Sequence, residues 1–154
     1  MIYFIADTHF DHENIIEYEN RPFKNAAEMN KVLIKNWNDV VNKDDIIFHL
    51  GDFDLAAADK AFEIFGKLNG NKYLVFGNHD GTYNKYVNRM GFKDAYKEFW
   101  FSDDIVLTHK PQAYPKHVLN IHGHIHAKHW KSNVWNDKNH ICVSAELLKY
   151  KPIN

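Results

Sequence analysis

Carboxylate, amide and imidazole side chains gather in five short clusters along this sequence. Two clusters, Asp7-Thr8-His9 and Gly123-His124-Ile125-His126, hold a pair of such residues at i, i+2 spacing, which places both side chains on one side of an extended segment. The other three are Gly51-Asp52, Gly77-Asn78-His79-Asp80 and Thr108-His109. Nitrogen and oxygen donors without thiolate suit Mn²⁺, Fe or Zn²⁺. The set is too large for one tetrahedral ion, so it predicts two adjacent ions that share a carboxylate and keep open positions for water or substrate.

The first half of the chain alternates between strand and helix patterns, which would position these clusters. Buried-strand and helical patterns follow one another over Ile2–Ala6, Asn25–Val41, Asp45–Leu50, Ala56–Leu68 and Lys72–Phe76. Asn25 is the expected N-cap of the first helix. Such alternation predicts a parallel sheet with helical crossovers, and the carboxyl ends of its strands lie at one edge. Because Asp7, Asp52 and Asn78 each lie just after such a strand, we expect them to share one crevice.

The second half of the chain is richer in strands. A short helix near Thr82–Met90 is followed by predicted strands over Glu98–Phe101, Ile105–Thr108, Leu119–His122 and Ile141–Ala145. We expect these strands to form a second, more antiparallel sheet. No repeat, low-complexity tract or linker divides the sequence, so residues 1–154 are predicted to form a single domain.

Charge and composition exclude several classes of protein. With 19 basic and 20 acidic residues the net charge is -1, so no global positive field favours nucleic acid or anionic lipid. The apolar start of the chain meets Asp7 too early for a signal peptide or membrane span, and Cys142, the single cysteine, cannot form an internal disulfide. We therefore expect a cytoplasmic protein with no membrane partner. Eleven histidines favour metal binding or proton transfer.

Taken in order, the D-x-H, G-D, G-N-H-D, H and G-H-x-H segments resemble the calcineurin-like metallophosphoesterases, from Asp7 to His126. Any one segment could be an ordinary strand-end turn, since Asn and Asp are common turn formers, but five in order at strand ends argue against chance. The resemblance implies an α/β fold, a four-layer α/β/β/α sandwich of two mixed sheets flanked by helices. The segments from Asp7 to Ile15, Asn20 to Phe23 and Tyr150 to Pro152 resemble the compact bacterial and phage branch of predicted phosphoesterases.

The resemblance also implies roles for individual residues. The expected cofactors are two divalent metal ions, with Mn²⁺ favoured and Fe, Zn²⁺, Ni²⁺ or Co²⁺ compatible with the same donors. One ion would be held by Asp7, His9 and His126, the other by Asn78, His109 and His124, with Asp52 bridging them. His79 matches the catalytic histidine of the family, which binds no metal. The implied reaction is attack on a phosphate ester by a metal-bridging hydroxide, with Asp52 and His79 as the catalytic residues and His79 assisting the leaving group.

Three residues near the first motif are candidates for substrate binding, namely His12, Asn14 and Arg21. Arg21 could hold a phosphate through two guanidinium nitrogens, or it could be a surface arginine before Pro22. Asp80 is interpreted as a structural residue, with orientation of a neighbouring histidine as the alternative.

Two further features near the last motif have alternative interpretations. His122 is a candidate to hydrogen-bond the metal-binding residues His124 and His126, because alternate residues of an extended segment point to the same side. Trp130 and Trp135 could stack a nucleobase or simply pack against the sheet.

The sequence favours a phosphodiesterase over a phosphomonoesterase, because short loops leave little room for the extra cations that a dianionic monoester needs. The expected partner is a phosphate-ester substrate, a class that includes nucleotides, and no obligatory protein partner or oligomeric state is indicated. A nuclease that cleaves polymeric DNA or RNA is an alternative, which the lysines around the last two motifs favour. A non-catalytic metal-binding scaffold is a further alternative, which the complete ligand set disfavours. Phe53-Asp54-Leu55 after G-D, and Asp80 in place of Glu, disfavour protein phosphatase activity.

Overall fold

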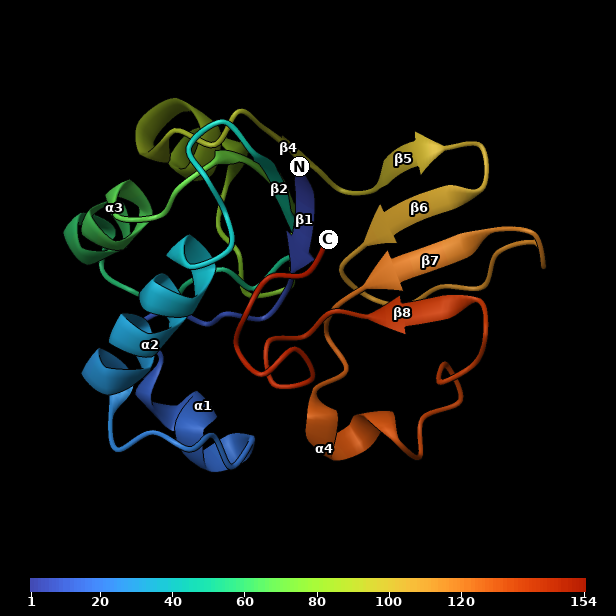
Figure 1. Cartoon of the computed structure of the whole chain (residues 1–154), viewed down its shortest axis with the longest axis horizontal. Coiled ribbons are helices and arrows are strands. Elements are labelled where there is room, and N and C mark those ends of the chain that lie inside the picture. Colours follow the sequence, from blue (N-terminus) through green and yellow to red (C-terminus); the bar gives the residue numbers. More distant parts are fainter.

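A parallel sheet forms the centre of the computed structural model, which describes residues 1–154 (Figure 1). Its strand order is β1-β2-β3-β4 and every neighbouring pair is parallel, so the carboxyl ends of the strands share one edge, as the alternation predicts. The sequence analysis did not predict the fourth strand, which has only three residues. The strands are β1 (Ile2–Ile5), β2 (Ile46–His49), β3 (Asn71–Val75) and β4 (Asp94–Tyr96).

Helices cover the outer face of this sheet (Figure 1). The N-cap prediction is confirmed, because the side chain of Asn25 accepts a hydrogen bond from the backbone N–H of Glu28 at 2.9 Å. Trp37 lies in the 19-residue core between these helices and the sheet. The helices are α1 (Glu13–Tyr18), which was not predicted, α2 (Ala26–Asn38), α3 (Ala58–Gly66) and the π-helical segment η1 (Asn84–Met90).

The second sheet has the order β5-β6-β7-β8, and only its β5–β6 pair is antiparallel. The second sheet is thus more antiparallel than the first, as predicted, but it is mixed and most of its strand pairs are parallel. Its strands after β6 are joined by the long connections 109–118 and 123–139, which return the chain to the same end before each new strand begins. The strands are β5 (Phe99–Ser102), β6 (Ile105–Thr108), β7 (Leu119–His122) and β8 (His140–Cys142).

The two sheets pack on each other through a separate apolar cluster of seven buried residues, including Phe48, Val75 and Leu107. They also meet where β1 and β8 end. Ala6 donates its backbone N–H to Val143 at 2.9 Å and accepts one from Ala145 at 3.0 Å. The segments that follow β1 and β8 therefore run side by side, at the edge where the strand-end clusters collect.

The outer face of the second sheet carries one short helix, α4 (Ala127–Trp130), and long loops. The expectation of helices flanking both sheets is thus met on one side only. Trp130 and Trp135 pack here, with ring centroids 5.5 Å from His122 and 4.8 Å from His140. None of the helices combines the length and the apolar composition that crossing a membrane requires.

Candidate metal centre

The segment after β1 turns sharply instead of continuing as a strand. Asp7 and His9 have φ angles of 55° and 49°, in the left-handed region that non-glycine residues rarely adopt. Each is held there by pairing with the turn after β2, where Asp7 donates its N–H to Gly51 at 2.9 Å and His9 to Asp52 at 3.0 Å. Asp52 has a φ of 55° as well. Left-handed backbone at such positions costs about 1–3 kcal/mol each, and the surrounding hydrogen bonds maintain it.

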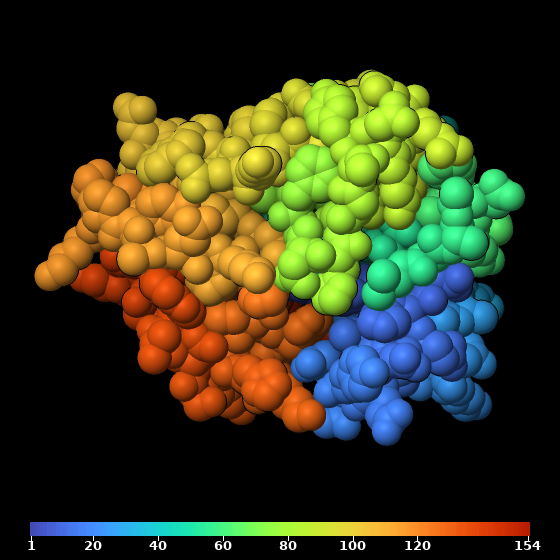
Figure 2. Space-filling view, turned by 180° about the vertical axis from the view of Figure 1, so that it is seen from behind, coloured from blue at the N-terminus to red at the C-terminus, as the bar shows by residue number.

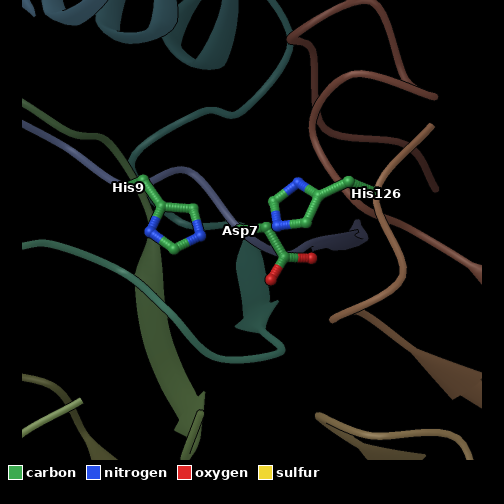
Figure 3. Close-up of side chains that lie close together, drawn as sticks. All are labelled: Asp7, His9 and His126. Carbon is green, nitrogen blue, oxygen red and sulfur yellow. The ribbon is translucent and has the colours of Figure 1, made fainter. Parts of the chain in front are cut away.

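Two groups of side chains converge on this edge. Figure 3 shows the first group, Asp7, His9 and His126, and the second consists of Asp52, His109 and His124. Within each group the ligand atoms lie within 4.8 Å of one another. His124 and His126 fall in different groups, which is the division that the family resemblance implies. Neither i, i+2 pair lies on an extended segment, because Asp7, His9 and His124 all have positive φ angles.

The carboxylate of Asp52 lies between the two groups. Its Oδ2 is 3.7 Å from Nε2 of His9 in the first group and 3.5 Å from Nε2 of His109 in its own group. Its Oδ1 accepts the backbone N–H of His79 at 2.9 Å. One oxygen therefore fixes the side chain, and the other faces an imidazole of each group.

Several donor atoms of the first group are buried and unpaired. Oδ1 of Asp7 and both ring nitrogens of His9 have no hydrogen-bond partner. A buried polar atom without a partner costs about 1–3 kcal/mol, and a bound cation would supply the missing interaction. Burial lowers the pKa of His9 well below its usual value, with the Arg21 charge adding to that effect, so the ring is neutral and able to bind a cation. These observations fit a divalent ion with nitrogen and oxygen ligands.

The other carboxylate oxygen of Asp7 is fully engaged by the protein. Oδ2 accepts hydrogen bonds from the backbone N–H of His124 at 2.9 Å and from Oγ of Ser144 at 2.5 Å. Burial raises the pKa of Asp7, although the nearby His126 and His109 oppose that rise. The contacts orient the carboxylate so that Oδ1 faces the first group.

A buried ionic network supports the third member of the first group. Nδ1 of His126 lies 3.1 Å from both oxygens of Glu146, so Nδ1–H donates to the carboxylate and Nε2 is left for an ion. Burial opposes charge on His126, but the hydrogen bond to Glu146 and the charge of Asp7 outweigh it and raise the pKa of His126 to about 9. Glu146 also pairs with Arg21 at 2.5 Å.

Arg21 holds the turn that carries Asp7. Its guanidinium donates to the backbone carbonyl of Asp7 at 2.7 Å and to that of Thr8 at 2.9 Å, and the side chain is completely buried. All its nitrogens are engaged inside the protein, including Nε on Glu146 at 2.7 Å. The structure therefore supports neither the phosphate-clamp interpretation of Arg21 nor the surface interpretation, because burial against main-chain carbonyls leaves no donor free.

The second group is positioned mainly by the backbone. Nδ1–H of His109 donates to the carbonyl of Leu50 at 2.9 Å, which leaves Nε2 facing Asp52 and 3.1 Å from Oδ1 of Asn78. Burial lowers the pKa of His124 to about 4, and the charges of His109 and Lys110 add to the effect. The His124 ring is therefore neutral and suited to bind a cation.

Two glycines allow the second group to form. Gly51 has a φ of 91°, and a Cβ there would lie 2.5 Å from Nδ1 of His109. A Cβ on Gly77 would lie 2.1 Å from Oδ1 of Asp52. Only glycine permits such close approach of the two turns, which explains the glycines of the G-D and G-N-H-D segments.

Asp80 joins the same two turns. Its carboxylate accepts the backbone N–H groups of Asp52, Phe53 and Gly77 at 2.7–2.9 Å. Burial raises the pKa of Asp80 despite these hydrogen bonds. The contacts agree with the structural interpretation of this residue.

The sequence model of the calcineurin-like phosphoesterase family matches residues 1–151. This chain belongs to that family. It is 43% identical over 162 residues to an uncharacterized protein of Methanocaldococcus jannaschii, covering 99% of this chain and 86% of that one. The Gene 66 protein of Mycobacterium phage L5 is 32% identical over 84 residues, which is 53% of this chain and 40% of that protein. A crystal structure of a protein of unknown function from Aquifex aeolicus has a TM-score of 0.74 and 31% identity, covering 99% of this chain and 94% of that chain.

Membership in the calcineurin-like phosphoesterase family implies metal-dependent phosphoesterase activity, and the two His/Asp groups are consistent with a dinuclear centre. Of the remaining candidates for such a site, His79 is exposed, and its ring centroid lies 5.9 Å from that of His9. His12 lies 5.5 Å from the same ring, and its Nδ1 is buried without a partner. Asn14 is exposed on α1 and makes no side-chain hydrogen bond.

His122 lies apart from this phosphoesterase site. Its Nδ1–H donates to the carbonyl of Gly123 at 2.8 Å, and its ring packs on Trp130 at the outer face of the second sheet. Burial lowers the pKa of His122 to about 4. Its surroundings are those of a packed side chain.

Ser144 and Glu146, which hold Asp7 and His126, were not predicted to belong to the site. Glu146 directly follows the last predicted strand, as Asp7 follows the first, and this position could have indicated it. The bond from Nε of Arg21 to Glu146 spans 125 residues, and no local pattern indicates it.

Proposed function

We propose that this protein is a dinuclear metal-dependent phosphodiesterase and that residues 1–154 act as one phosphoesterase domain. In this proposal the first ion is bound by Asp7, His9 and His126, the second by Asn78, His109 and His124, and Asp52 bridges them. The observation that carries the proposal is the position of Asp52, whose Oδ2 faces His9 Nε2 at 3.7 Å and His109 Nε2 at 3.5 Å. A shared carboxylate is what two adjacent ions require.

The chain's own groups have distinct tasks in this reaction. Two bound divalent ions, with Mn²⁺ as the favoured metal, would neutralise phosphoryl oxygens and supply an activated water. Glu146 and Leu50 keep His126 and His109 in the tautomer that presents Nε2. His79 is tied to Asp52 through its backbone N–H, and its exposed imidazole would donate a proton to the leaving oxygen.

Arg21, one candidate cation for a dianionic monoester, is engaged inside the protein, and this is the observation behind the preference for a diester. A phosphate monoester is a dianion and calls for a cationic side chain beside the ions, whereas a diester carries one negative charge. The arginine that the sequence offers for that purpose is buried and fully engaged by Glu146 and main-chain carbonyls.

The proposal is tested by hydrolysis of bis-p-nitrophenyl phosphate beside p-nitrophenyl phosphate. Protein stripped by a chelator is refilled separately with Mn²⁺, Ni²⁺, Zn²⁺ or Mg²⁺. We expect metal-restored cleavage of the diester at a higher rate than the monoester. Cleavage of the monoester alone would overturn the diester proposal, and no hydrolysis with two ions bound per chain would favour a non-catalytic scaffold.

The role of His79 is tested by His79→Ala. We expect this variant to retain both ions while kcat falls by about 10²–10⁴, the usual contribution of a general acid. His117→Ala is the matched control, because His117 is exposed and forms no hydrogen bond. Loss of bound metal in His79→Ala would show that the residue is a ligand instead.

A further inference from the structure

A cavity of about 270 Å³ opens beside the second ligand group. Asn78 and His109 form part of its wall, so the cavity is continuous with the proposed centre. Lys97, Lys110 and Gln112 line it as well, next to Phe76 and Gly77. Figure 2 shows this face of the molecule, where the segment around residue 80 (light green) borders the segment around residue 110 (orange).

The charge of this cavity is uncompensated. No carboxylate lines it, and the ammonium groups of Lys97 and Lys110 make no ion pair or hydrogen bond. The other cavity, of about 260 Å³ between α2 and α3, differs in this respect. Its Lys60 and Lys67 both pair with Glu63, at 3.4 and 2.6 Å, so only Lys31 of its three lysines is unpaired. Two unpaired positive charges beside a metal centre favour an anionic ligand.

The backbone that carries Lys110 is fixed by buried polar side chains. Oγ1 of Thr108 donates to the carbonyl of Lys110 at 2.7 Å, and Nδ2 of Asn120 donates to Oγ1 of Thr108 at 2.9 Å. Oδ1 of Asn120 accepts the N–H of Gln112 at 3.1 Å. Thr108 and Asn120 are each 1% exposed, so buried side chains of the second sheet hold the loop that contains Lys110 and Gln112.

Lys97 lines the same cavity and directly follows the first sheet. The residue before it, Tyr96, accepts the N–H of Phe76 at 2.8 Å and is the last residue of β4. The two lysines therefore approach the same cavity from different sheets, each on ordered backbone. Because lysine side chains are flexible, both ammonium groups could contact one anion bound in the cavity.

We infer that Lys97 and Lys110 form a subsite for a second phosphate, so that the substrate is a short phosphodiester with a further phosphate near the scissile one. This inference rests on the proposed phosphodiesterase function. Lysine ammonium groups bind phosphate as point charges. At about 270 Å³ the cavity is close to the lower end of small-ligand sites, which are about 300–1,000 Å³.

Binding of product-like nucleotides tests the subsite without turnover. Thymidine 3′,5′-bisphosphate and thymidine 5′-monophosphate are titrated calorimetrically into the metal-loaded protein. We expect the bisphosphate to bind at least about tenfold more tightly, since one charge-assisted pair of this kind contributes about that factor. The preference is the Kd of the monophosphate divided by the Kd of the bisphosphate. Lys97→Gln and Lys110→Gln should each lower this ratio, and the double variant should bring it close to one.

Lys43→Gln is the matched control, because Lys43 is an exposed lysine before β2, at the opposite edge of the sheet. It should leave the ratio unchanged. Equal affinity for the two nucleotides in the wild type, or an unchanged ratio in the double lysine variant, would overturn the subsite.

A kinetic arm then separates the subsite from the proposed function. The dinucleotide TpT is compared with its 5′- and 3′-phosphorylated forms, and at least one phosphorylated form should have a KM about tenfold lower. If the wild type binds the bisphosphate preferentially but hydrolyses no diester, the proposed function fails and the anion site stands. If it hydrolyses bis-p-nitrophenyl phosphate but shows no preference for a second phosphate, the subsite fails and the proposed function stands.

Discussion

The two ligand groups of this protein are held in place in different ways. The first depends on charged and polar side chains from distant parts of the chain, since Arg21 and Glu146 support His126 and Ser144 supports Asp7. The second depends on main-chain contacts, where the carbonyl of Leu50 orients His109.

The electrostatic consequences of these two designs are opposite. The carboxylate of Glu146 helps raise the pKa of His126 to about 9, whereas burial among other cations lowers the pKa of His124 to about 4. A proton therefore competes with a metal ion at the first group near neutral pH, and much less at the second. Metal binding at the first group therefore depends on side-chain charge, and metal binding at the second group depends on backbone geometry.

The largest effect is expected at Asp52, which the two groups share. Asp52→Asn keeps the size of the side chain but removes the charge facing His9 and His109. We expect fewer than two ions per chain and a fall in diesterase activity of about 10³ or more, because neither the positions nor the charges of the ions are then maintained. Elemental analysis of the dialysed protein and bis-p-nitrophenyl phosphate hydrolysis measure the two quantities.

Asp44→Asn serves as the control for this variant, because Asp44 is exposed and far from the centre. Full occupancy by two ions in Asp52→Asn would contradict the bridging role.

A smaller and selective effect is expected at Glu146. Glu146→Gln retains an oxygen for Nδ1–H of His126 but removes the charge that pairs with Arg21. We expect the affinity of the ion at the first group to fall about 10–100-fold and that of the other ion to stay within about twofold. The reason is that a hydrogen bond to a metal-binding histidine affects the one ion which that histidine binds. Calorimetric titration with Mn²⁺ resolves the two steps.

Glu63→Gln removes an exposed glutamate that pairs only with lysines, and it should change neither step. Equal weakening of both ions by Glu146→Gln would show that the two groups are not supported independently.

The smallest effect concerns the stability of the metal-free protein against pH. The pKa of His126 in the folded chain, about 9, lies above its ordinary 6.5, so the stability it contributes is complete below pH 6.5 and is lost as pH rises through 9. The contribution is at most about 3 kcal/mol for a shift of this size. Urea unfolding of chelator-treated protein between pH 6 and 9.5 measures it, with His126→Gln expected to remove this part of the decline.

His124 should act in the opposite direction. Its folded pKa of about 4 lies below 6.5, so the unfolded chain binds the proton first and stability falls as pH drops from 6.5 to 4. His124→Gln should reduce this acid-side loss and leave the alkaline side unchanged, and His129→Gln, an exposed histidine on α4, should affect neither. If the three histidine variants showed the same dependence of unfolding free energy on pH, the proposed electrostatic difference between the two ligand groups would be wrong.

The parts of the fold that the sequence predicts are those with a clear hydrophobic period and recognisable ends. β1 is a continuous apolar run, β2 and β3 are mostly apolar, and α2 has a helical stripe with Asn25 at its start. The missed elements α1, β4 and α4 have six, three and four residues, too few to establish a period. The sequence did not indicate that most strand pairs of the second sheet are parallel, because strand direction depends on where the connecting loops return.

Apolar runs and polar ends are local properties of the chain, so the sequence predicts the donor atoms and their place after the strands, and the family resemblance divides them between two ions. The distances among the donors depend on tertiary packing, since Asp52 comes between His9 and His109 where two glycine turns touch. The role of Arg21 depends on packing as well, because a contact across 125 residues forms only once the sheets are assembled.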